Sequence, residues 1–231
     1  MKKIIGIQGN ICYEPIDISK EKLRILEDIL DELYSKGSVS TFGIPVNTPL
    51  EIPRMICQSA NNHSDIQISG VNSQLTVRYD NRFSNNAEKC FAYCKERMFL
   101  MQKALKEIGA KIKFSGINVQ YVCEENLKSI EILKEKAFKF EENAKIFDVL
   151  GRVTYVKENT FYINLTVNNL RAVNKCEAVG VSLDVNDRYF DNFKEGSHNP
   201  DETLEKILDI HKKFENKTLS RLIEEGVFYG D

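Results

Sequence analysis

The segment at residues 5–13, IGIQGNICY, decides the fold class, because apolar and polar residues alternate along it. The same alternation recurs at residues 75–79 (LTVRY) and 117–123 (INVQYVC), and an amphipathic helical stretch follows each of the three segments. A side-chain period of two indicates strands with one buried and one wet face, which is typical of antiparallel sheets.

Four stretches have the apolar spacing of amphipathic helices, and local signals mark several of their ends. Ser19 and Asn199 are N-cap candidates, and Gly109 ends the second helix. Residues 157–159 predict a tight hairpin turn. The helices are expected at about residues 20–36, 87–108, 127–140 and 200–214, and further strands at 65–70, 147–156, 160–167 and 178–185.

This order of elements predicts an α+β fold, with mostly antiparallel sheets and about four amphipathic helices packed on one face. The polar run at residues 141–145 is the best candidate boundary. It separates an N-terminal α+β half (1–143) from a C-terminal ββ(β)α half (144–231), unless the two halves form one continuous domain.

Composition and charge narrow the classes of protein to which the chain can belong. It has 231 residues and a formal net charge of -2, and 42% of it is hydrophobic. A nucleic-acid partner is not expected, because such proteins usually carry a basic footprint. The N-terminus does not have the pattern of an export signal, and no apolar stretch reaches the length of a membrane span. We therefore expect a cytoplasmic protein without a membrane partner.

Six cysteines raise the question of disulfides or a metal site. Without an export signal, we expect reduced thiols that act as small apolar residues. Cys90 and Cys94 lie one helical turn apart and could share a zinc ion, but a tetrahedral site needs two further ligands. Cys57 and His63 are the only loose candidates, so packing is the favoured interpretation of the cysteine pair.

Two weak catalytic hypotheses remain. Asp184, Asp187 and Asp191 form an acidic run that could hold magnesium for phosphoryl transfer, although the alternation places Asp184 on a solvent face. His211 lies on the buried stripe of the last helix, where a hydrogen-bonded core histidine is the simpler interpretation. Phosphate-binding loops, dinucleotide fingerprints and nucleophile elbows are missing, and no cofactor is predicted.

The segment from Phe42 to Arg54 contains three prolines, so neither a regular helix nor a central strand fits it. Its apolar residues could cover the chain's own sheet or dock on another subunit. The candidate interaction residues are Ile44, Val46, Leu50, Ile52 and Met55.

Three stretches of the chain have a recognisable layout. They are residues 66–121 (strand, hairpin, long helix, strand), the motif GVSLDV at 180–185, and the closing helix at 204–215 with Thr218. In that layout the chain resembles a sporadically distributed, uncharacterised bacterial family, from which it departs near the N-terminus. Since that family has no assigned activity, the resemblance implies no catalytic residues.

From these observations we expect a non-enzymatic cytoplasmic binding protein. It would bury apolar surface in a homo-oligomer or against a protein partner. The alternative is a metal-dependent enzyme that acts on a nucleotide or nucleic acid through Asp184, Asp187 and His211.

Overall fold

A computed structural model describes residues 2–35, 38–43, 45, 48–80, 82–123, 148–158, 160–171, 177–188 and 199–219, and all structural statements below concern these residues. Strands and helices alternate in groups along the chain. Their bounds are β1 (Lys2–Tyr13), α1 (Lys20–Leu30), β2 (Val39–Thr41), β3 (Met55–Gln58), β4 (Ser64–Ile68), β5 (Asn72–Arg78), α2 (Ala87–Glu107), β6 (Ile112–Cys123), β7 (Leu150–Lys157), β8 (Phe161–Arg171), β9 (Glu177–Asn186) and α4 (Pro200–Lys213), which a π-helical turn (Phe214–Thr218) continues.

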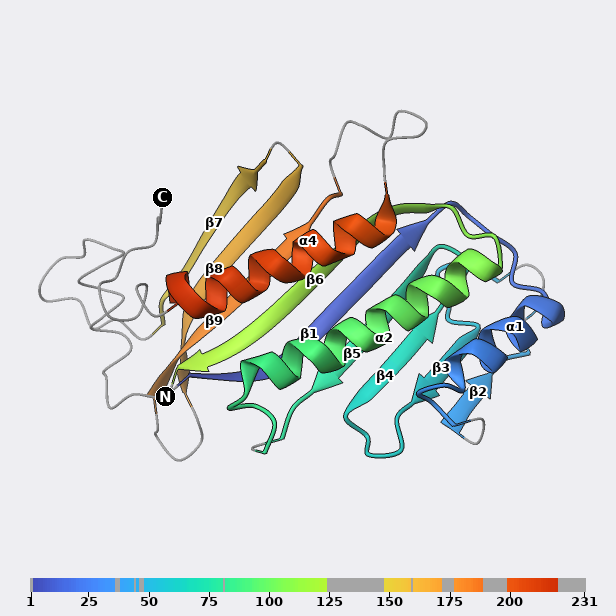
Figure 1. Cartoon of the computed structure of the whole chain (residues 1–231), viewed down its shortest axis with the longest axis horizontal. Helices are drawn as coiled ribbons and strands as arrows, with labels where there is room; N and C mark the ends of the chain where they lie inside the picture. The colour runs from blue at the N-terminus through green and yellow to red at the C-terminus, as the bar shows by residue number, and fades with distance from the viewer. Residues whose placement is uncertain are drawn as a thin grey trace, which may run out of the picture.

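The strands form one nine-stranded sheet in the order β2-β3-β4-β5-β1-β6-β9-β8-β7, and every neighbouring pair is antiparallel. The first strand of the chain lies in the middle of the sheet (Figure 1). β6 pairs with β9 from Gly116 to Cys123, so strands from both sides of the candidate boundary share one sheet.

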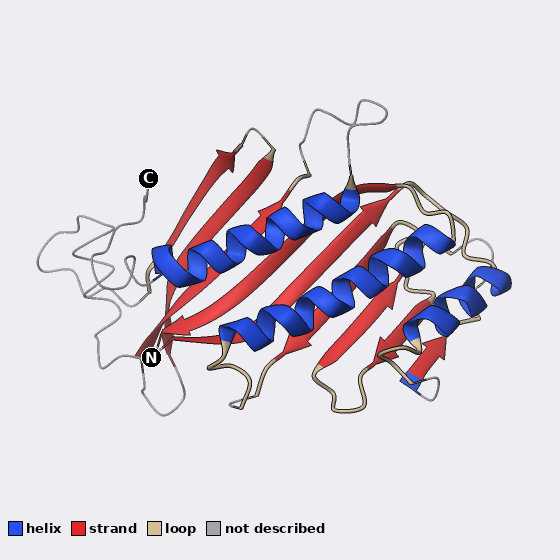
Figure 2. Cartoon of the chain, viewed as in Figure 1, coloured by secondary structure: helices blue, strands red, loops and turns tan. Residues whose placement is uncertain are grey.

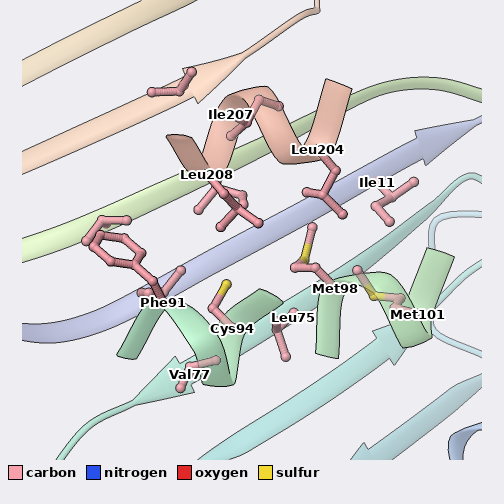
Figure 3. Close-up of a cluster of buried hydrophobic side chains, with 14 of the residues drawn as sticks. Ile11, Leu75, Val77, Phe91, Cys94, Met98, Met101, Leu204, Ile207 and Leu208 are labelled. Atoms are coloured by element: carbon pink, nitrogen blue, oxygen red, sulfur yellow. The ribbon is translucent and has the colours of Figure 1, made fainter. Parts of the chain in front are cut away.

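The three described α-helices lie on the same face of the sheet (Figure 2). α2 packs over β1 and β5, α4 packs over β6 and β9, and α1 packs beside α2. Side chains of α2 and α4 meet those of the strands in one apolar layer (Figure 3). The layer includes Ile11, Leu75, Cys94, Met98, Leu204, Ile207 and Leu208, all fully buried.

Gly9 sets how closely α2 approaches β1. A Cβ atom at this position would overlap the side chain of Met98. Glycine has no Cβ atom and leaves this space free. This explains why a glycine, which weakens a strand interior, lies in β1 where α2 packs against the sheet.

The predicted α+β class with an antiparallel sheet is confirmed, but the expected number of helices is not. The described residues contain three α-helices rather than about four. The fourth expected helix, at residues 127–140, lies outside the described residues, as does the polar run at 141–145. α1 also ends at Leu30, before the basic residue and glycine at 36–37, because turns at residues 31–34 follow it.

A β-bulge changes the face of one residue in the first strand. The pairing of β1 with β6 shifts between Ile4 and Gly6, and this extra residue reverses the alternation at that point. Ile4 is therefore buried, whereas Ile5, which the simple alternation places inside, is 41% exposed.

The predicted local signals are confirmed. The Ser19 side chain accepts a hydrogen bond from the backbone of Lys22, and the Asn199 side chain accepts one from Asp201, so both residues are N-caps. Gly109 has a φ of 77°, which permits the chain to leave α2. The β7–β8 hairpin closes where the Thr160 N–H donates to the Lys157 carbonyl at 3.1 Å.

The two faces of β1 predict opposite effects of neighbouring alanine substitutions. Ile7→Ala removes a fully buried side chain from the apolar layer and should lower the free energy of unfolding by about 2–5 kcal/mol. Gln8→Ala changes an exposed residue on the other face, and its effect should stay within about 0.5 kcal/mol. Urea denaturation measures both. Equal losses for the two variants would contradict this assignment of faces.

Candidate functional site

The sheet face opposite the helices carries a row of polar side chains that crosses the molecule. Strand register places one residue of each strand except β2 side by side, and paired residues share a face. None of these residues is buried. This polar row consists, in spatial order, of Gln58, Asp65, Thr76, Gln8, Asn118, Asp184, Asn164 and Thr154.

Hydrogen bonds connect one half of the polar row. The Thr154 hydroxyl donates to the Asn164 carbonyl oxygen at 2.7 Å, and the Asn164 amide donates to the Asp184 carboxylate at 2.9 Å. Asn186, two residues further along β9, also donates to the Asp184 carboxylate, at 3.0 Å. The side chains of this half are therefore held in place before any partner binds.

The rows on either side have a similar composition. One contains Arg152, Thr166, Ser182, Gln120, Gly6 and Arg78, and the other contains Val156, Tyr162, Asn186, Gly116, Asn10, Gln74, Gln67 and Ile56. We call these two rows and the polar row the open face. It contains no lysine and no glutamate, although 29% of the whole chain is charged.

The abundance of asparagine and aspartate on the open face runs against local preference. Both residue types are depleted in strands, where threonine and β-branched residues fit better. Here Asn10, Asn118, Asn164 and Asp184 occupy the interiors of strands that have a neighbour on both sides. Departures from local preference without a stabilising reason are expected at functional sites, which makes the open face the candidate functional site.

The structure does not bring the three candidate catalytic residues together. Asp184 lies on the open face, and His211 lies in α4 on the opposite side of the sheet. Asp187 is fully buried, and its carboxylate accepts the Ser115 backbone N–H at 2.7 Å. Asp191 lies outside the described residues. Among the described residues, no three His, Cys, Asp or Glu side chains are grouped as metal ligands would be.

His211 is a core histidine. Its Nε2 lies 2.9 Å from the Ile117 carbonyl oxygen and donates to it, which ties α4 to β6. Burial lowers the pKa of His211 to about 4, and the hydrogen bond to Ile117 only partly opposes this shift. The imidazole is therefore neutral at physiological pH.

His211 predicts a loss of stability in acid. Between pH 6.5 and about 4 the unfolded chain binds a proton that the folded chain does not, so the free energy of unfolding falls as the pH falls. The full shift corresponds to about 3 kcal/mol. Urea denaturation at several pH values measures it. His211→Gln keeps a donor for Ile117 without titrating, and an unchanged slope in this variant would contradict the assignment.

The cysteines pack in the core. Cys57, Cys90 and Cys94 are fully buried, and burial raises the pKa of each thiol to about 12. Zinc ligands must be thiolates, so this environment does not favour metal binding by Cys90 and Cys94. His63, the other loose candidate, lies 3.7 Å from the Asp80 carboxylate and against the ring of Phe83.

The buried thiols should resist alkylation. At pH 8 we expect iodoacetamide to label Cys57, Cys90 and Cys94 more than about a hundredfold more slowly in the folded protein than in urea. Cys12, which is only partly buried, should react first and serves as the internal comparison. Mass spectrometry of peptides locates the labels, and rapid labelling of Cys94 in the folded chain would contradict its burial.

The proline-bearing segment contributes both to the core and to the surface. Met55 is fully buried in β3 and so belongs to the core rather than to an interaction surface. Leu50 accepts the Gly70 backbone N–H at 2.7 Å and packs on that residue. Ile52 is 45% exposed. Ile44 and Val46 lie outside the described residues.

A second polar cluster, which no sequence pattern predicted, is buried on the helix side. The Arg97 guanidinium lies 3.3 Å from the centre of the Tyr93 ring, and its Nε donates to the Ser64 hydroxyl at 3.2 Å. Tyr34 is 3.0 Å from the same hydroxyl. The cluster joins the chain after α1 to α2 and β4, which is a structural role.

A groove of about 650 Å³ lies along α2, and Glu32 and Leu33 after α1 and Asp201 of α4 also line it. Its lysines are paired: Lys103 lies 2.6 Å from Glu32, and Lys106 lies 2.6 Å from Asp201. Such exposed pairs contribute little to stability. We therefore take the open face, and not this groove, as the candidate functional site.

No family model matches the chain, and no curated protein matches it. The resemblance to the bacterial family therefore stays a prediction. Within the described ranges, no helix has the length and apolar character that crossing a membrane would require.

Proposed function

We propose that this chain is a non-enzymatic binding protein that contacts a protein partner through the open face of its sheet. The polar row that crosses every strand except β2 is the observation that carries the proposal. A cytoplasmic location is part of it, and the thiols of Cys57, Cys90 and Cys94, buried in the core, are in keeping with a reducing compartment.

The chemistry of the open face suits a protein surface. Amides donate and accept hydrogen bonds, so they can match the N–H and C=O groups of a polypeptide. Short side chains such as Asn, Ser and Thr lose less rotamer freedom on binding than Lys or Glu. Protein interfaces are depleted of Lys and Glu, and antibody paratopes use Tyr, Ser, Gly and Asn for adaptable contacts.

The alternative of a metal-dependent enzyme has less support from the geometry. The Asp184 carboxylate already accepts two amide hydrogen bonds, from Asn164 and Asn186. His211 lies across the sheet from it and is buried. Magnesium chemistry at Asp184 would need ligands that the described residues do not group around it.

A charge placed in the middle of the open face should abolish binding. We expect the double variant Gln8→Lys, Asn118→Lys, used as an immobilised bait in extract of the source cells, to retain its main partner at least about tenfold less than wild type. A tenfold change corresponds to about 1.4 kcal/mol. Quantitative mass spectrometry of the retained proteins provides the measurement.

Ala92→Lys is the control, because it also adds a lysine, at an exposed position of α2 on the other side of the molecule. It should retain partners as wild type does. If the wild type and both variants capture the same proteins in the same amounts, the open face is not the binding surface and the proposal fails.

A further inference from the structure

The two edges of the sheet differ in how they are protected against pairing with another strand. At one edge, β2 has only three residues, and a short edge strand offers few backbone groups to another strand. At the other edge, β7 has eight residues without proline or acidic residues, and no described strand pairs with its outer side. Leu150 is 63% exposed, Val156 51% and Tyr155 43%.

We propose that β7 pairs with β7 of a second copy of this chain, so that two nine-stranded sheets join across a twofold axis. The proposal concerns the edge of the sheet, where Arg152, Thr154 and Val156 form the end of the open face, and it goes beyond the proposed function. It rests on two observations: which backbone groups of β7 point outward, and how its side chains match themselves when the strand is reversed.

The inner hydrogen bonds of β7 show which of its backbone groups point outward. The Lys157 carbonyl accepts from Thr160 across the hairpin, and the Val149 carbonyl accepts from Asn169 of β8. Residues of an antiparallel strand alternate in the side to which they bond. The odd-numbered residues therefore bond to β8, and Leu150, Arg152, Thr154 and Val156 direct their N–H and C=O groups to the outer edge.

One register of self-pairing satisfies these outward groups and also matches the side chains. With the twofold axis at Val153, Leu150 lies opposite Val156 of the second copy, and Arg152 lies opposite Thr154. Both pairs consist of outward-pointing residues, so each exchanges two backbone hydrogen bonds. The pairing covers the two most exposed apolar side chains of the strand, and it places Tyr155 across from Gly151, where an aromatic ring can cover the glycine.

The two neighbouring registers of β7 with itself match the side chains less well. An axis at Arg152 sets two arginines opposite each other, and like charges in that position are destabilising. An axis at Thr154 sets Arg152 opposite Val156 and moves Leu150 beyond the end of the partner strand. The axis at Val153 is therefore the one in which the edge is self-complementary, as a twofold interface must be.

Charge exchange across this interface tests the proposal. Sedimentation over a range of concentrations should show that the wild type forms a dimer and that L150E or V156K alone raises its dissociation constant at least about tenfold. The double variant L150E/V156K should dimerise more tightly than either single variant, because each acid then faces a lysine. L150K/V156K, with like charges at the same sites, is the matched control and should stay monomeric. Both positions are at least half exposed, so thermal melting should show intact folding in every variant.

Disulfide formation tests the register. Val153 and its symmetry mate form a pair with Cα atoms about 4.5 Å apart, which lies within the range of a disulfide. Val153→Cys should give a covalent dimer on mild oxidation, whereas Thr154→Cys and wild type should not. A wild-type chain that stays monomeric up to about 1 mM, a dimer unchanged by L150E and V156K, or cross-linking of Thr154→Cys in preference to Val153→Cys would overturn the proposal. A monomer whose β7 edge binds a different protein would also overturn it.

Discussion

The burial of one face of the sheet beneath α2 and α4 is the constraint on which the rest of the structure depends. The apolar side chains of β1, β5, β6 and β9 alternate with polar ones, so packing against the helices fixes which side chains face outward. A slip of one residue in any strand would put its apolar side chains in water. The same packing therefore holds the polar row in register and makes His211 a buried, neutral side chain.

The two faces consequently have different relations to stability and function. The apolar layer contributes most of the stability, because apolar area removed from water is the dominant favourable term in folding. The open face contributes little, and its asparagines and aspartates are not the residues that a strand would choose for stability. Residues that neither pack nor favour the strand conformation are free to be selected for what they bind. That freedom is the physical basis for assigning binding to this face rather than to the grooves between the helices.

Sequence alone predicted much of the fold, because the signals concerned are local. Alternation at residues 5–13 and 117–123 and the caps at Ser19 and Asn199 depend only on near neighbours. Strands of three or four residues, such as β2 and β3, are too short to show a clear alternation of apolar and polar side chains. The bulge that exposes Ile5 depends on the partner strand.

The polar row was present in the sequence as amides at alternate positions. Its alignment needed the register of pairs such as Gln8 with Asn118 and Asn118 with Asp184, which are far apart along the chain.

The central position of β1 has a consequence for how the protein is made. The ribosome releases β1 well before its two neighbours in the sheet, β5 and β6, which begin at residues 72 and 112. Because β6 pairs with β9, the described strands β7 and β8 are connected to the rest of the sheet only through β9, which follows them along the chain. β1 must therefore stay unpaired until residues far along the chain have been synthesised. Contacts so distant along the chain are typical of slow folding, during which unpaired edges are exposed to aggregation.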